Sequence, residues 1–142
     1  MINTILTFYI FIIMSFITII HIYWFNGGFW PAQNKKDFID KVLGRGEDVP
    51  GTIPYILVIL CFAGISIFPL LVYYNIDIGI KSFEKYLFLI LAIIFLLRAI
   101  SMSIPIIANR ATKIFLEYNR KYYSPLCLSL GISYFILFYI YN

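Results

Sequence analysis

The chain has 142 residues, of which 62% are hydrophobic and only 13% charged, and its mean hydropathy is +0.90. A soluble domain carries about a quarter of its residues as charges, and a small soluble monomer has too much surface to cover with so few. Two cysteines far apart in the chain form no disulfide framework, and an aromatic content of 20% excludes a disordered chain. The composition therefore predicts an integral membrane protein with the lipid bilayer as its surroundings.

The net charge is +4, from 11 lysines and arginines against 7 acids. A basic balance occurs both in nucleic-acid-binding proteins and in the loops of membrane proteins. No lysine- or arginine-rich run lies outside the gaps between apolar segments. We therefore expect no nucleic-acid partner.

Four segments are long and apolar enough to cross about 30 Å of hydrocarbon. They run over residues 4–25, 53–74, 86–107 and 123–141. Each must be helical, because lipid satisfies no backbone group and a barrel would need alternating strands. The first segment lacks the basic start and cleavage site of a signal peptide. The prediction is an all-α, integral membrane four-helix bundle that forms a single transmembrane domain over residues 1–142.

The connecting segments indicate the orientation. Within the first of them, Asn34–Leu43 is expected to form one or two amphipathic turns with Phe38, Ile39, Val42 and Leu43 inward. The first and third connections together hold eight lysines and arginines, whereas the opposite side holds two. Because lysine and arginine concentrate in cytoplasmic loops, the long loops are predicted to be cytoplasmic and both termini outside.

Arg98 is the only formal charge well inside a predicted span. Placing it in hydrocarbon costs about 3 kcal/mol on insertion scales. It either extends its side chain to the headgroups or points into the bundle and pairs there. Ser101 and Pro105 follow on its own face of the helix, which favours the second interpretation.

His21 is the only histidine, and it ends a polar stripe on the first helix. This stripe should face protein rather than lipid. His21 is then either a hydrogen-bonded interhelical residue or a proton relay or ligand contact. One histidine and two distant cysteines are too few ligands for a metal or haem within one chain, so no metal or cofactor is expected. The polar positions of the stripe are Thr4, Thr7, Ser15, Thr18 and His21.

Two further features lie near the ends of the first and fourth spans. Gly27 and Gly28 allow a sharp turn after the first helix, which folds Trp30 back as a lid or forms an anchored turn. Ser124 and Pro125 are expected to cap and open the fourth helix. One stripe on that helix is typical of a packing surface and contains Cys127, Gly131, Tyr134 and Phe138. Cys127 is also a weaker candidate nucleophile.

The segment His21-Ile-Tyr23-Trp24-Phe-Asn-Gly27-Gly28-Phe-Trp30 and the segment Tyr123-Ser124-Pro125-Leu-Cys127-Leu resemble the paired motifs of a family of small bacterial membrane proteins, the domain-of-unknown-function family 3995. The resemblance covers essentially the whole chain and includes an arginine in the third span. It differs where family members carry Gly-Asp shortly after that arginine, here Ser101-Met102, and an acid before the Ser-Pro motif, here Asn119. The resemblance implies a fold and a bacterial inner-membrane location but no reaction.

The resemblance and the residue patterns together predict one ligand-binding site on the cytoplasmic side. The first, third and fourth helices are predicted to gather these residues around one cavity, because unpaired polar groups in hydrocarbon cost free energy. No catalytic residue is nominated. The site residues are His21, Tyr23, Trp24, Gly27, Gly28, Trp30, Arg98, Ser124, Pro125 and Cys127.

The leading functional hypothesis is a multi-pass membrane protein with a polar pocket on the cytoplasmic side that binds a small anionic or lipidic ligand or a partner membrane protein. The alternative is a small dimeric membrane transporter, which the absence of an acid inside any span disfavours for proton coupling. A membrane-embedded enzyme is the third hypothesis. The sequence contains no Cys-x-x-Cys, His-Glu-x-x-His, Gly-x-Ser-x-Gly or Walker motif to support one.

Overall fold

The computed structural model describes residues 1–141, and within them the chain is helical with no strand. The all-α prediction is therefore confirmed. Four long helical segments are present: α1 (Ile2–Phe25), α3 (Thr52–Tyr73), α4 (Glu84–Ser101), and a continuous helix made of α6 (Lys113–Tyr118), the π-helical η3 (Asn119–Tyr123) and α7 (Ser124–Ile140). The short elements are α2 (Lys35–Phe38), the π-helical η1 (Ile39–Leu43), the 3₁₀-helical η2 (Lys81–Phe83) and α5 (Pro105–Ala108).

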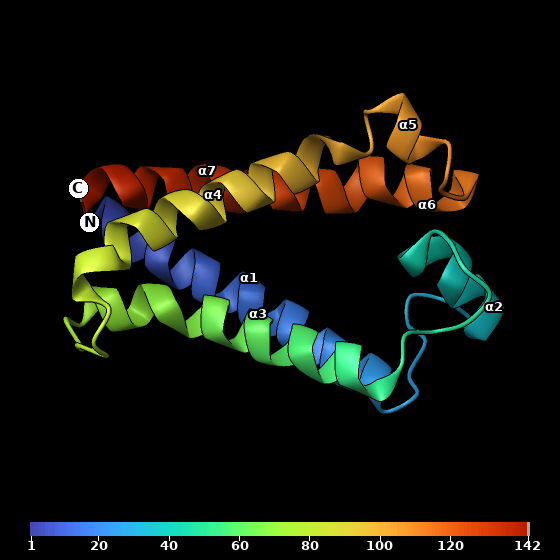
Figure 1. The fold of residues 1–142 in the computed structure, drawn as a ribbon, viewed down its shortest axis with the longest axis horizontal. Coiled ribbons are helices and arrows are strands. Elements are labelled where there is room, and N and C mark those ends of the chain that lie inside the picture. The colour runs from blue at the N-terminus through green and yellow to red at the C-terminus, as the bar shows by residue number, and fades with distance from the viewer. Residues whose placement is uncertain (142) are drawn as a thin grey trace.

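The long helices form two pairs, α1 with α3 and α4 with α7, and α1 also contacts α7. Figure 1 shows the two pairs running along the long axis of the molecule. The start of α1, the end of α7 and the α3–α4 connection lie at one end, while α2, α5 and α6 lie at the other. The first and third connections therefore share an end, which we call the α2–α6 end, as the sequence predicted.

Three of these helices are long and apolar enough to cross a membrane, namely α1, α3 and the continuous helix Lys113–Ile140. This supports a membrane protein. The fourth long helix, α4, has 18 residues and includes Glu84, Lys85 and Arg98. Its membership of a four-span bundle stays a prediction.

The predicted third span, 86–107, is helical only to Ser101. Ile104 adopts an extended conformation with φ −83° and ψ 118°, and Pro105 opens the separate helix α5. The ring of a proline clashes with a helical residue before it, so the chain leaves the helix ahead of Pro105. Arg98 consequently lies in the last turn of α4 rather than about two turns inside a longer helix.

The helix that contains the predicted fourth span, 123–141, begins before it. This helix starts at Lys113, where Thr112 accepts a hydrogen bond from the backbone N–H of Phe115. The interpretation of Ser124 as a cap and Pro125 as a helix start is wrong, because the helix passes through both by way of the π-helical turn 119–123. A π turn changes the backbone hydrogen-bond register, so a proline directly after it need not end the helix.

The polar stripe of α1 faces α3, as expected for polar side chains in an apolar helix. Thr4 Oγ1 lies 3.2 Å from the hydroxyl of Tyr73, and Ser15 Oγ lies 2.8 Å from Ser66 Oγ. These contacts between hydroxyl groups pair polar atoms across the helix interface, whereas Thr7 Oγ1 of the same stripe is buried without a hydrogen-bond partner among residues 1–141.

Tyr134 joins the two helix pairs. Its side chain is fully buried, and its ring stacks on Phe95 of α4 with 5.7 Å between centroids. Its hydroxyl donates to the carbonyl of Ile65 on α3 at 3.0 Å. That carbonyl lies four residues before Pro69, which has no N–H to bond it within the helix. A side chain from α7 thus supplies the donor that Pro69 removes from α3.

The stripe that contains Gly131 and Tyr134 is confirmed as a packing surface. A Cβ atom at Gly131 would lie 2.8 Å from Cγ of Leu96 and 3.1 Å from its backbone nitrogen, so α4 and α7 are in close contact there. Small residues let two helices approach closely. In lipid this close packing drives helix association, because the hydrophobic effect between helices is weak there.

The Tyr134–Ile65 bond leads to a double-mutant prediction. Tyr134→Phe removes the hydroxyl and keeps the ring, so it should lower the free energy of unfolding in detergent by about 1 kcal/mol. Pro69→Ala restores an N–H that can bond the Ile65 carbonyl, so the same tyrosine change should cost much less in that background. Tyr139→Phe is the matched control, because that side chain is 71% exposed. Equal losses in both backgrounds would contradict the assignment.

Candidate functional site

Arg98 is the centre of a polar cluster at the α2–α6 end of the α4–α7 pair. Its Nη1 donates to Oδ1 of Asn119 at 2.9 Å, and Nδ2 of Asn119 donates to Oγ of Ser124 at 2.8 Å. Asn119 is only 2% exposed, whereas Arg98 and Ser124 are half-buried. We call these three residues the Arg98 cluster. Arg98 therefore pairs within the protein, as its polar helix face predicted.

The π-helical turn places Asn119 opposite Arg98. Asn119 opens this turn and Ser124 follows it directly, so both lie where the register of the helix changes. Single π turns inside α-helices occur often at functional sites, because they turn a side chain toward a position that a regular helix would not reach. The cluster thus joins the last turn of α4 to the one irregular turn of its partner helix within residues 113–140.

The Arg98 charge has no acidic partner in the part of the chain that the structure describes. The two ion pairs there join Lys35 to Asp48 and Lys41 to Asp37. A guanidinium group has five N–H donors, and the amide of Asn119 accepts from one of them without neutralising the charge. Half-buried and uncompensated, this charge favours a bound anion.

His21 belongs to a second cluster, on the α1–α3 pair. Its Nδ1 donates to the carbonyl of Ile17 at 2.8 Å, which requires the proton on that nitrogen because a carbonyl only accepts. Its ring packs against Trp24 and against Phe62 of α3, with 4.8 and 4.9 Å between centroids. His21 is therefore in contact across the helix interface. Within residues 1–141 no hydrogen bond connects it to Arg98, and the shared cavity stays a prediction.

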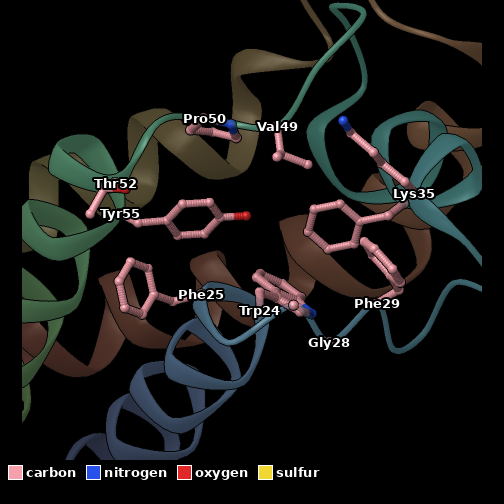
Figure 2. A pocket seen from close by; sticks show the side chains of 11 residues that line it. Trp24, Phe25, Gly28, Phe29, Lys35, Val49, Pro50, Thr52 and Tyr55 are labelled. Atoms are coloured by element: carbon pink, nitrogen blue, oxygen red, sulfur yellow. The ribbon is translucent and has the colours of Figure 1, made fainter.

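An aromatic pocket of about 270 Å³ opens where α1 and α3 meet the first connection (Figure 2). Trp24, Gly27 and Gly28, three of the predicted site residues, line it, whereas Arg98, Ser124 and Cys127 do not. Its aromatic side chains are Trp24, Phe25, Phe29, Phe38 and Tyr55, and Lys35 is at its edge.

The turn after α1 forms as the paired glycines predicted. Gly27 has φ +88°, a conformation that side chains rarely adopt, and a Cβ at Gly28 would lie 2.2 Å from the ring of Tyr23. Trp24 Nε1 donates to the carbonyl of Trp30 at 2.6 Å, and this bond anchors the turn. The indole of Trp30 is 58% exposed and does not line the pocket.

The first connection packs onto α6, a contact that the sequence did not indicate. Thr112 Oγ1 donates to the carbonyl of Asp40, and its backbone N–H donates to the carbonyl of Gly44. Gly44, with φ +76°, lies against the ring of Phe115, where a Cβ would approach to 2.5 Å. Of the residues expected to point inward, Phe38 and Ile39 are buried and Val42 and Leu43 are half-buried.

Lys41 pairs its charge within the first connection and links that connection to Tyr123 through its backbone. Its Nζ lies 2.7 Å from Oδ2 of Asp37, and this hydrogen bond holds the pKa of the Asp37 carboxyl below its ordinary value. Its backbone carbonyl accepts from the hydroxyl of Tyr123 at 3.3 Å. The lysine charge is thus already neutralised, in contrast with that of Arg98.

Sequence reasoning missed the two residues that organise this end, Asn119 and Thr112. The Asn119 position was noted only for its lack of an acid, and a lone Thr112 in a loop carries no pattern. Cys127 is half-buried and packs against the core, and no base contacts it in the hydrogen-bond network of residues 1–141. Among the same residues no group of three or more histidines, cysteines or acids is placed to hold a metal.

The chain belongs to the family described as "Protein of unknown function (DUF3995)", whose model matches residues 14–134. The match includes Arg98, Asn119, Ser124 and the turn after α1, so both clusters lie in the part that defines the family. Neither the curated proteins nor the solved structures contain a match to the chain.

The contact between the first connection and α6 can be tested at Thr112. Thr112→Val removes the helix cap and the bond to the Asp40 carbonyl, so it should lower the free energy of unfolding by about 1–2 kcal/mol. It should also speed amide hydrogen exchange over residues 34–44, which the contact otherwise protects. Thr52→Val is the control, because Thr52 is exposed at the start of α3. Unchanged exchange over 34–44 would show that Thr112 does not hold this segment.

Proposed function

We propose that this member of the family is a multi-pass protein of the bacterial inner membrane that binds an anionic lipid, or an anionic ligand of lipid-like structure, at the Arg98 cluster. The observation that carries the proposal is the half-buried guanidinium of Arg98, which bonds the neutral Asn119 and has no acidic partner within residues 1–141. Its remaining N–H groups are free for the oxygens of a phosphate, which arginine binds with paired, charge-assisted hydrogen bonds.

The surroundings of Arg98 support access from the bilayer. Leu97, one residue before Arg98, and Ile100, two residues after it, are 58% and 55% exposed, so lipid chains can approach the same turn of the helix. The position in the last turn of α4 corresponds to the depth at which lipid phosphates lie if α4 spans the bilayer. An anionic lipid can then place its phosphate on Arg98 and its chains along α4.

Transport and catalysis receive no comparable support. Of the acids on the long helices, Glu84 opens α4 and Glu117 lies in α6, near the start of its helix. A proton-coupled carrier normally needs an acid deep inside the membrane. We therefore propose binding rather than transport.

Two substitutions remove the anion preference of the Arg98 cluster in opposite ways. Arg98→Gln deletes the charge, and Asn119→Asp supplies an internal counter-charge with almost the same shape. The wild-type protein in neutral detergent should gain thermal stability on titration with phosphatidylglycerol, because a ligand that binds the folded state stabilises it. Both variants should lose most of that gain, which corresponds to binding weaker by about tenfold or more.

Basal stability separates the two variants. Asn119→Asp should be as stable as the wild type or more stable without lipid, since a charged pair replaces a neutral contact, so its lost response cannot come from misfolding. Lys113→Ala is the matched control, an exposed basic residue at the same end, and it should keep the response. A full phosphatidylglycerol response in Asn119→Asp would overturn the proposal.

The orientation is a separate prediction. Eight basic residues of the first and third connections lie at the α2–α6 end, so this end should be cytoplasmic and the start of α1 and the end of α7 should be outside. In a variant whose Cys61 and Cys127 are replaced by serine, a single cysteine at Asp40 should react with a membrane-impermeant maleimide only after the cells are opened. A single cysteine at Asn3 should react in intact cells. The reverse pattern would contradict this orientation.

A further inference from the structure

The aromatic pocket has two facing walls and a charged edge. Trp24, Phe29 and Phe38 form one wall, with ring centroids 5.2 Å apart for Trp24–Phe38 and 6.0 Å for Phe29–Phe38. Phe25 and Tyr55, 6.1 Å apart, form the other. Figure 2 shows the ring of Tyr55 extending into the pocket opposite Lys35, with Trp24 on one side and Val49 and Pro50 on the other.

Five aromatic rings around so small a volume favour a cation that cannot donate hydrogen bonds. The face of each ring is negative, and a quaternary ammonium group gains from several faces at once. Such a group is weakly hydrated, so an apolar wall does not cost it the hydrogen bonds that a primary ammonium would lose. The pocket of about 270 Å³ is too small for a drug-sized molecule but admits a trimethylammonium group with a short polar extension.

The edge of the pocket indicates what else the ligand carries. Lys35 lines it, and Lys35 Nζ lies 2.6 Å from Oδ1 of Asp48, with both side chains more than half exposed. Asp48 balances the charge of Lys35 in the free pocket, and a ligand with a phosphate next to its ammonium group can exchange that phosphate for Asp48 at Lys35. An exposed ion pair contributes little free energy, so the exchange costs little.

We propose that the aromatic pocket is a cage for a quaternary ammonium group joined to a phosphate, the chemistry of a phosphocholine headgroup. The trimethylammonium lies between the two aromatic walls, and the phosphate lies at Lys35. This site shares no lining residue with the Arg98 cluster and goes beyond the anionic-lipid function proposed above.

The two tryptophans provide a direct measurement, because only Trp24 lines the pocket. In a Trp30→Phe protein, Trp24 is the only fluorescent indole, and its contact with the Trp30 carbonyl uses the backbone and is kept. Phosphocholine should change this fluorescence with a saturable curve. The isostere 3,3-dimethylbutyl phosphate, which replaces the ammonium by a neutral carbon, should bind weaker by about tenfold.

Matched variants test whether phosphocholine binds in the aromatic pocket. Tyr55→Leu and Phe25→Leu should each weaken phosphocholine binding several-fold, whereas Tyr74→Leu, the same change at an exposed position at the other end of α3, should not. Lys35→Gln should remove the preference for phosphocholine over choline, and Lys36→Gln should leave it intact, because Lys36 does not line the pocket. Asn119→Asp should bind phosphocholine normally, which separates this site from the Arg98 cluster.

A second titration distinguishes a lipid from a free phosphocholine ester as the natural ligand. If the natural ligand is a lipid, short-chain phosphatidylcholine should bind at least tenfold tighter than phosphocholine in the same detergent. If it is a free ester, the two affinities should be similar. Equal binding of the neutral isostere, the absence of a saturable signal, or unchanged affinity in both Tyr55→Leu and Phe25→Leu would overturn the proposal.

Discussion

The hydrogen bond from Tyr134 to the carbonyl of Ile65 is the contact on which the arrangement of the helices depends. Pro69 lacks the N–H that would bond this carbonyl within its own helix. An unpaired carbonyl in an apolar surrounding raises the free energy of the folded state, because lipid offers no hydrogen-bond donor. The donor, the Tyr134 hydroxyl, comes from the other helix pair. The Ile65 carbonyl without a donor in α3 therefore favours a position of α7 that brings Tyr134 to it. A second hydrogen bond between the pairs joins the hydroxyls of Tyr9 and Ser129, which lie 2.6 Å apart.

The core between the pairs is built around this point. Ile10 and Met14 of α1, Phe88 and Ala92 of α4, and Leu130 of α7 are fully buried around Tyr134. At the α2–α6 end the buried residues include Phe38 against Trp24, Phe115 against Gly44, and Asn119 beside Arg98. Both clusters at this end lie on the long helices, the Arg98 cluster on α4 and the helix 113–140 and His21 on α1, and the short segments pack beside them.

The two proposed sites differ in how their charges are balanced. At the Arg98 cluster one positive charge meets a neutral amide, which leaves an electrostatic preference for an anion. At the aromatic pocket Lys35 and Asp48 already balance one another, and the selectivity comes from the rings. One end of a small protein therefore carries two chemically distinct surfaces.

Composition and hydropathy were enough to predict an all-helical membrane protein, the course of α1 and α3, and the common end of the first and third connections, because burial in lipid acts on each apolar segment separately. The same local reasoning failed at Pro105 and Pro125. The chain leaves the helix before Pro105 but passes through Pro125 in a helix, and a π turn, in which Asn119 contacts Arg98, precedes only Pro125. His21, Trp24 and Arg98 were recognised as unusual residues, but their partners could not be, since Phe62, Phe38 and Asn119 are distant in the chain and become neighbours only when the helices pack. The sequence determined which side chains need partners, and the tertiary structure decided which partners they meet, because hydrogen bonds and ring contacts act over a few ångströms and leave no periodic pattern in the sequence.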